Sequence, residues 1–184
     1  MCKLNKNVFL VLALFVMMVA FSMPSQIQAQ DVAAGSATAT VQTPLTVTST
    51  AALAFGTIFQ GVQSSVPETD ANAGIFTITG QGTAGISIYL QFPDYMSTAT
   101  GDDRMVISFS TTDCAIDTTA NVDPTVAATG WTDQNPYNLP SGVIIGGASG
   151  QTALFLGGSV NPSVDQTAGA YTADIILTVA YNGA

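Results

Sequence analysis

The side chains of this chain that could do chemistry are mainly acidic. Asp102 and Asp103 are adjacent, and Asp113 and Asp117 follow a short distance downstream. Carboxylates and backbone carbonyls supply the roughly six to eight oxygen ligands that Ca²⁺ takes in proteins. The set Asp102, Asp103, Asp113 and Asp117 is therefore a candidate calcium site, although no EF-hand spacing is present. The alternative is a solvated acidic loop that keeps the protein soluble. No other cofactor is indicated.

Catalysis finds little support in the remaining side chains. The chain has no histidine, its two lysines are Lys3 and Lys6, and Arg104 is the one other base. A serine or cysteine nucleophile needs a general base, and the usual imidazole is absent. Two carboxylates about 5 to 9.5 Å apart could still hydrolyse a glycosidic bond. We expect that the protein is not an enzyme, and a small carboxylate hydrolase is the third-ranked function.

The N-terminal segment, residues 1–29, has the features of a secretory signal peptide. Lys3 and Lys6 form a basic start, and Val8 to Phe21 is an unbroken apolar run of 14 residues. This run is shorter than the roughly 20 residues that span a bilayer. We expect cleavage after Ala29 and export to the periplasm, the cell surface or the medium, with no membrane span in the mature chain.

The mature chain, residues 30–184, is strongly acidic and has one thiol. Without Lys3 and Lys6 the formal charge changes from 3 − 12 = −9 to 1 − 12 = −11. Such a surface repels phosphate backbones, so nucleic-acid binding is excluded. Cys114 is the one remaining cysteine. It cannot form an intramolecular disulfide, and it is either buried or available for intermolecular pairing.

Alternation with a period of two residues predicts an all-β domain. The longest alternating stretch runs from Tyr171 to Tyr181, with Tyr171, Ala173, Ile175, Leu177, Val179 and Tyr181 on one face. We expect a long central strand there, with these large apolar side chains in the core. Shorter alternating runs separated by Gly, Asn and Pro occur around Phe76, Ile88 and Ile107. Such faces are buried together in a single antiparallel β-sandwich.

The alternation fails between residues 110 and 142, where we expect a long loop. Loops of this length are uncommon inside compact domains and are often functional. This segment holds the one tryptophan, Trp131, and also Tyr137. Trp131 either covers one end of the sandwich or, like Tyr137, serves as an exposed contact residue.

Two blocks resemble a known family. They comprise residues 39–47 with 53–58, and residues 156–160 with Gln166 and 169–182. Together they resemble the exported bacterial family of unknown function numbered 4402, which is similar to spore coat protein U and to chaperone-usher pilins. In pilins a glycine precedes a near-terminal tyrosine by twelve residues, and Gly169 and Tyr181 have this separation.

The resemblance implies an immunoglobulin-like, pilin-like sandwich and a structural role. We expect a secreted structural or adhesive surface protein, assembled as a fibre or coat by β-strand addition and assisted by a periplasmic chaperone. The alternative is a module that presents the 110–142 loop to a glycan or protein. Pilins commonly carry a disulfide, which this chain cannot form. The candidate added strand, residues 30–40, pairs either with an edge of its own sandwich, which effective concentration favours, or with an edge of a neighbouring copy. It has mainly small side chains, so backbone hydrogen bonds would supply most of its affinity.

The first prediction concerns processing. The basic start and the apolar run predict that the exported protein begins at or near Gln30. Intact-mass measurement of the exported protein checks this prediction. A mass that includes Met1 or the apolar run would contradict it.

Overall fold

The computed structural model describes residues 11, 13–15, 17–18, 33–126 and 129–183. The chain divides into a first unit, residues 1–39, and a second unit, residues 40–184. In the first unit the described residues up to 18 are helical, and residues 33–39 are exposed and belong to no helix or strand. Within the described ranges no helix has the length and apolarity needed to cross a membrane. Most of the predicted signal peptide, with its cleavage site, lies outside these ranges.

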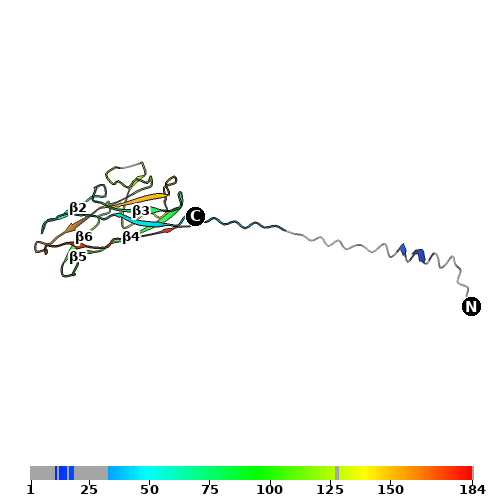
Figure 1. The fold of residues 1–184 in the computed structure, drawn as a ribbon, viewed down its shortest axis with the longest axis horizontal. Helices are drawn as coiled ribbons and strands as arrows, with labels where there is room; N and C mark the ends of the chain where they lie inside the picture. Colours follow the sequence, from blue (N-terminus) through cyan, green and yellow to red (C-terminus); the bar gives the residue numbers. More distant parts are fainter. Residues whose placement is uncertain (1–10, 12, 16, 19–32, 127–128, 184) are drawn as a thin grey trace, which may run out of the picture. The chain divides into compact units, whose positions relative to one another are not determined.

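The second unit consists of antiparallel β-sheets (Figure 1). Its strands are β1 (Thr46–Ala51), β2 (Ser64–Val66), β3 (Gly74–Thr79), β4 (Gly85–Gln91), β5 (Tyr95–Thr98), β6 (Arg104–Ser108), β7 (Cys114–Asp117), β8 (Trp131–Gln134), β9 (Val143–Ile144), β10 (Gln151–Leu156), β11 (Gly158–Asn161), β12 (Tyr171–Thr172) and β13 (Ile176–Tyr181). They form three sheets, with strand orders β1-β3-β10-β7-β8, β12-β5-β6-β11-β2 and β13-β4-β9. The predicted all-β, antiparallel class is confirmed.

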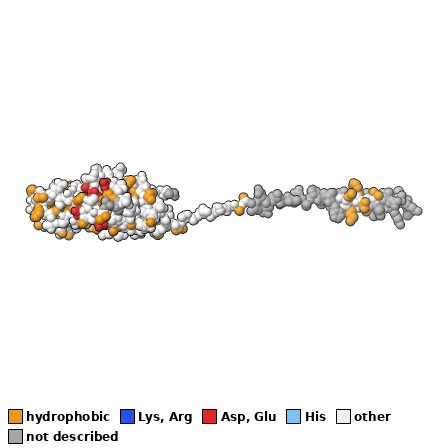
Figure 2. All heavy atoms as spheres, turned by 90° about the horizontal axis from the view of Figure 1, so that it is seen from above, with side chains coloured by type: hydrophobic (Ala, Val, Ile, Leu, Met, Phe, Trp, Pro, Cys, Tyr) orange, Lys and Arg blue, Asp and Glu red, His pale blue; other side chains and the backbone are white. Residues whose placement is uncertain are grey.

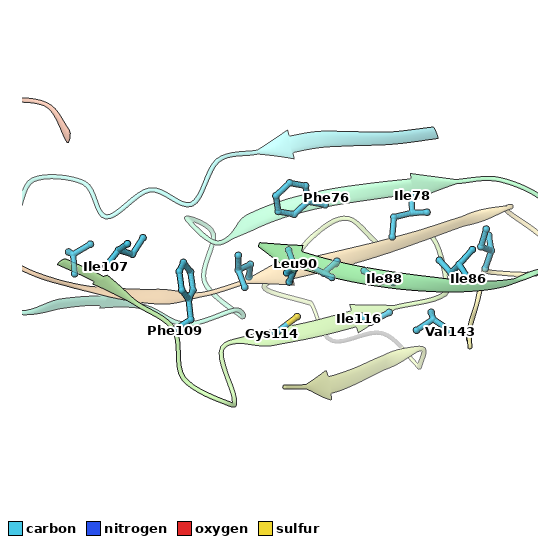
Figure 3. Packing of buried hydrophobic residues seen from close by; sticks show 14 of the residues in the cluster. Phe76, Ile78, Ile86, Ile88, Leu90, Ile107, Phe109, Cys114, Ile116 and Val143 are labelled. Atoms are coloured by element: carbon cyan, nitrogen blue, oxygen red, sulfur yellow. The ribbon is translucent and has the colours of Figure 1, made fainter. Parts of the chain in front are cut away.

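One apolar cluster joins the three sheets. The first sheet contributes Ile78 and Leu154, the second contributes Ile107, and the third contributes Ile86 and Val143 (Figure 3). Alternation along each strand produces this cluster, as in β4, where residues 86, 88 and 90 are buried and residues 87, 89 and 91 are exposed. Full burial of each such side chain is worth about 1.5–3 kcal/mol. The inward faces predicted around Phe76, Ile88 and Ile107 are confirmed.

The strand at the centre of the first sheet is β10, which lies between β3 and β7. Five of its six residues are buried, because both of its faces are covered. Leu154 and Leu156 face the main cluster, whereas Phe155 lies in a second, smaller cluster on the opposite face. Trp131 of β8 stacks on Phe155 with a ring-centroid separation of 4.7 Å.

The predicted single central strand from Tyr171 to Tyr181 is wrong in two respects. It is divided into β12, which pairs with β5, and β13, which pairs with β4. Both strands lie at the ends of their sheets. The large side chains do contact the main cluster, but Tyr171, Ile175, Leu177, Val179 and Tyr181 are half-buried. Alternation reports which face of a strand is inward, and an edge strand alternates as regularly as a central one.

The expected loop at residues 110–142 contains two strands. β7 and β8 pair with each other, and β7 also pairs with β10. All four residues of β7 are buried, including the carboxyl-bearing Asp117. A strand that is covered on both faces has no alternation, which explains why the pattern failed here.

The next prediction compares two leucines in the monomeric protein. Leu154→Ala should lower the free energy of unfolding by about 3–5 kcal/mol, because the side chain is fully buried and leaves a cavity. Leu177→Ala should cost roughly 1–2 kcal/mol, because this side chain is half-buried at a sheet edge. Urea denaturation of both variants measures the difference. Equal losses would contradict the edge position of β13.

Candidate functional site

The first and last strands leave an opening in the β-structure. Within the described ranges β1 pairs only with β3, and β13 pairs only with β4. Each strand therefore has one side without a strand partner. We call the inward-facing surface between β1 and β13 the seam. Leu177 and Val179 of β13 are half-buried, whereas Ile88 and Leu90 of the paired strand β4 are only 8% and 5% exposed.

A hollow of about 340 Å³ opens at one end of the seam. One wall is formed by Ser49, residues 51–53 and Phe55, from β1 and the segment after it, and the other by residues 173–175 before β13. Core side chains of Phe76, Ile107 and Leu156 also line it. The hollow therefore gives access to the main apolar cluster. Asp174 is the one charged residue among the described residues that line it.

Tyr181 closes the other end of the seam. Its hydroxyl donates to the carbonyl oxygen of Thr43 at 2.7 Å and accepts from the backbone N–H of Gln81 at 2.7 Å. These bonds join the end of β13 to the segments that flank β1 and β3. Gly80 allows the Tyr181 hydroxyl to come close to the backbone, because a Cβ atom at residue 80 would lie 2.5 Å from the tyrosine oxygen. Gly169, predicted with Tyr181 as an assembly residue, lies elsewhere, exposed in the loop before β12.

The loop between β11 and β12 is held by a polar cluster around Asp103. Oδ2 of Asp103 accepts from the Tyr171 hydroxyl at 2.7 Å and from the Thr167 backbone N–H at 2.8 Å. The hydroxyl has a second acceptor, the Thr167 carbonyl oxygen, also at 2.7 Å, and its one proton serves one acceptor at a time. Buried Gln166 donates to the same hydroxyl at 2.9 Å.

This geometry changes the acidity of both partners. The hydrogen bond from Tyr171, followed by those from Thr167, holds the pKa of Asp103 well below its ordinary value. Burial, reinforced by the carboxylate, raises the pKa of the Tyr171 hydroxyl. Asp103 is therefore an ionised acceptor that orders a loop.

The four aspartates predicted to bind calcium are not brought together. Asp102 is exposed, and Asp113 accepts from the backbone N–H and the hydroxyl of Ser110. Oδ1 of Asp117 accepts from the backbone N–H and the hydroxyl of Thr119, and its buried Oδ2 has no partner. No three His, Cys, Asp or Glu residues in the described ranges are placed to hold a metal ion. The physical reason is that Asp113 and Asp117 bond within their own turns, whereas Asp103 bonds to Thr167 and Tyr171, which lie far from it in sequence.

The two predicted contact aromatics have different environments. Trp131 is half-buried on Phe155, and its Nε1 donates to Oδ1 of Asp133 at 2.9 Å. It covers the outer face of the first sheet instead of one end of the molecule. Tyr137 is exposed, although its hydroxyl donates to the Phe109 carbonyl oxygen at 3.2 Å and its ring lies edge-on to Phe92.

Cys114 is buried in the main cluster. Burial, with a smaller contribution from the charges of Glu68 and Asp113, raises the pKa of its thiol to about 12. The thiolate needed for nucleophilic attack or disulfide exchange is therefore not formed at neutral pH. Of the two alternatives open from the sequence, the buried one is confirmed.

None of the known protein-family models matches this chain, and no curated protein does. The resemblance to family 4402 therefore stays a prediction.

The third prediction tests the polar cluster. Tyr171→Phe removes the main cause of the low pKa of Asp103, so this pKa should rise toward its ordinary value of 3.8. Carbon-13 NMR of the side-chain carboxyl measures it. Tyr95→Phe, at a half-exposed tyrosine on β5, is the control and should leave the pKa unchanged.

The same cluster sets the sign of a pH effect on stability. Because folding lowers the pKa of Asp103, its contribution is present above the unfolded-state value of 3.8 and is lost as the pH falls below it. The loss of stability on acidification should therefore be smaller in Tyr171→Phe than in the wild type. An Asp103 pKa that is the same in both proteins would contradict the assigned hydrogen bond.

Proposed function

We propose that this protein is an exported structural or adhesive subunit of a surface assembly, and that copies join by β-strand addition at the seam. The observation that carries the proposal is the pair of edge strands, β1 and β13, beside an opening to the core. An immunoglobulin-like sandwich that lacks one strand accounts for this arrangement. Such an arrangement supports the pilin-like role that the resemblance implies.

The physical basis of the proposal is that β1 and β13 each have one edge whose backbone N–H and C=O groups pair with no other strand in the described ranges. An unpaired strand edge presents a row of N–H and C=O groups that recruits another chain. Beneath these edges the half-buried side chains of Ile175, Leu177 and Val179 keep apolar area in contact with water. One added strand would pair with the backbone and cover these side chains together.

The segment before β1 is the candidate for the added strand. Ala33–Thr40, the described part of the predicted arm, is exposed and in no strand, and Val41 is 93% exposed. Ala37, Ala39 and Val41 share one parity, with Thr38 and Thr40 on the other. An alanine side chain has one carbon, against three in valine and four in leucine, so it buries roughly a quarter to a third of their CH₂ equivalents and backbone hydrogen bonds would contribute most of the affinity.

The surface composition supports an assembled, exported protein. Figure 2 shows a face on which uncharged side chains predominate, with small groups of acidic side chains and no visible Lys or Arg. An open seam on a secreted subunit exposes apolar surface before assembly, which favours a periplasmic chaperone as a transient partner. The competing proposal, ligand binding by residues 110–142, is less favoured because Trp131 is used internally on Phe155.

The experiment compares two double variants of the arm in the full, exported chain. Proline removes a backbone donor, so Ala37→Pro with Ala39→Pro should prevent strand pairing. Ala37→Ser with Ala39→Ser keeps both donors and is the matched control. Size-exclusion chromatography with light scattering should show assemblies for the wild type and the serine variant, and monomers for the proline variant. Assemblies from the proline variant, or a wild type that stays monomeric at all concentrations, would overturn the proposal.

A further inference from the structure

A second hollow, independent of the seam, lies between two loops. Its volume is about 530 Å³, and it is lined by residues 56–60, Met105, Pro162, residues 166–169 and Tyr171. The loops lie at the end of the second unit opposite its C-terminal residues, where the orange-red loop after β11 turns back (Figure 1). We call it the tip hollow. Its size falls in the range of about 300–1,000 Å³ that is typical of small-ligand sites.

Hydrogen bonds between the loops form the tip hollow in advance of any ligand. The backbone N–H of Gly61 donates to the Ser163 carbonyl oxygen at 3.0 Å, and the Gln60 side chain donates to the Gln166 carbonyl oxygen. Gln166 is 5% exposed, and its amide also donates to the Arg104 carbonyl oxygen at 3.2 Å. A ligand would therefore have little loop ordering to impose, which favours binding.

The two loops that form the tip hollow carry exposed apolar side chains. Phe59 and Val62 are the first and last residues of a turn, closed by a 3.2 Å bond from the Val62 N–H to the Phe59 carbonyl oxygen. Gly61 occupies the third position with φ +69°, where glycine is favoured, and the Val164 side chain lies against it. Phe59, Val62 and Val164 are 73%, 55% and 83% exposed. All three lie on the two loops that the hydrogen bond from Gly61 to Ser163 joins.

The residues that line the tip hollow indicate which class of ligand it could bind. Alongside the apolar groups stand the Thr57 hydroxyl and the Gln60 amide, which has donor and acceptor capacity beyond its one bond to Gln166. None of the described residues that line the hollow is charged. A purely apolar ligand would leave these polar groups unpaired, at a cost in binding free energy. A sugar ring has both a C–H face that stacks on an aromatic ring and hydroxyls that pair with amides.

Charge near the tip hollow distinguishes neutral from acidic sugars. Asp103 bonds directly to Tyr171 and Thr167 of the lining, and Asp165 lies in the same loop. The whole sequence carries a formal charge of −9. Negative potential around a binding site disfavours ligands with carboxylates or sulfates.

We propose that the tip hollow binds a ring of a neutral saccharide, with Phe59 stacked on its C–H face and Thr57 and Gln60 bonded to its hydroxyls. This inference goes beyond the proposed assembly, because the site uses residues outside the seam. An adhesive subunit would then carry its glycan site at the end remote from Tyr181.

The test uses the monomeric protein and two matched probe sets. One set contains neutral oligosaccharides built from glucose, galactose, mannose and N-acetylglucosamine, and the other contains the same backbones with uronic or sialic acid. Saturation-transfer NMR identifies binders, and isothermal titration calorimetry gives affinities. We expect at least one neutral saccharide to bind with Kd below about 10 mM. Its acidic counterpart should bind at least about tenfold more weakly.

Variants separate the stacked ring from general effects. Phe59→Ala should weaken binding by about tenfold or more, and Phe59→Trp should retain it, because the larger ring still stacks. Tyr89→Ala removes a similarly exposed aromatic from β4 and should leave affinity unchanged. No binding by any neutral saccharide up to about 10 mM, or equal affinities for wild type and Phe59→Ala, would overturn the proposal. A failure of saccharide binding would not change the result expected from chromatography of the arm variants. The saccharide proposal and the assembly proposal can therefore be rejected independently.

Discussion

Three antiparallel sheets share one apolar cluster but do not close around it, and the rest of the structure depends on this packing constraint. β10 is covered on both faces and pairs on both sides, so it forms the best-protected part of the domain. Protection decreases outward from it, to β1 at one edge of its own sheet and to β13 at the edge of another. The seam lies where these two edges leave the cluster incompletely covered.

The two ends of the molecule are stabilised by different means. Near the C-terminal residues, the Tyr181 hydroxyl joins the segments flanking β1 and β3 and closes one end of the seam. At the tip, Asp103, Gln166 and Tyr171 hold a loop that lies in no strand. Both ends therefore depend on a tyrosine hydroxyl in place of ion pairs. This fits a chain whose mature part has Arg104 as its one formal cation. Between the two ends, apolar packing in the shared cluster supplies most of the stability.

Sequence patterns predicted which face of a strand is buried better than they predicted which strands pair with each other. The inward parity of β4 and β6 was correct, because each has one buried face and one exposed face. β7 was missed because its four residues are all buried, and a strand without an exposed face has no period. β13 was taken as central because the number of partners of a strand is not encoded in its alternation.

The site residues show the same limit. Gly169 and Tyr181 were predicted together as assembly residues from their sequence separation. Tyr181 bonds to Thr43 at one end of the seam, whereas Gly169 is exposed in the loop before β12, because sequence separation does not determine where two residues lie in the fold. The predicted aspartate cluster required four carboxylates to converge, whereas Asp113 and Asp117 bond within their own turns and Asp103 bonds to the loop between β11 and β12. The tip hollow was missed because Phe59 and Val164 are about a hundred residues apart in sequence, and no sequence pattern indicates the bonds that join their loops, such as Gly61 to Ser163 and Gln60 to Gln166.

Hydrogen exchange followed by mass spectrometry tests the open seam most directly. In the monomer, amides in peptides covering 46–51 and 176–181 should exchange much faster than those covering 151–156, because β1 and β13 each have one side that pairs with no strand in the described part of the chain. In assembled protein the first two peptides should become protected, while the β10 peptide should stay unchanged. Protection of β1 and β13 equal to that of β10 in the monomer, or unchanged exchange on assembly, would contradict the account.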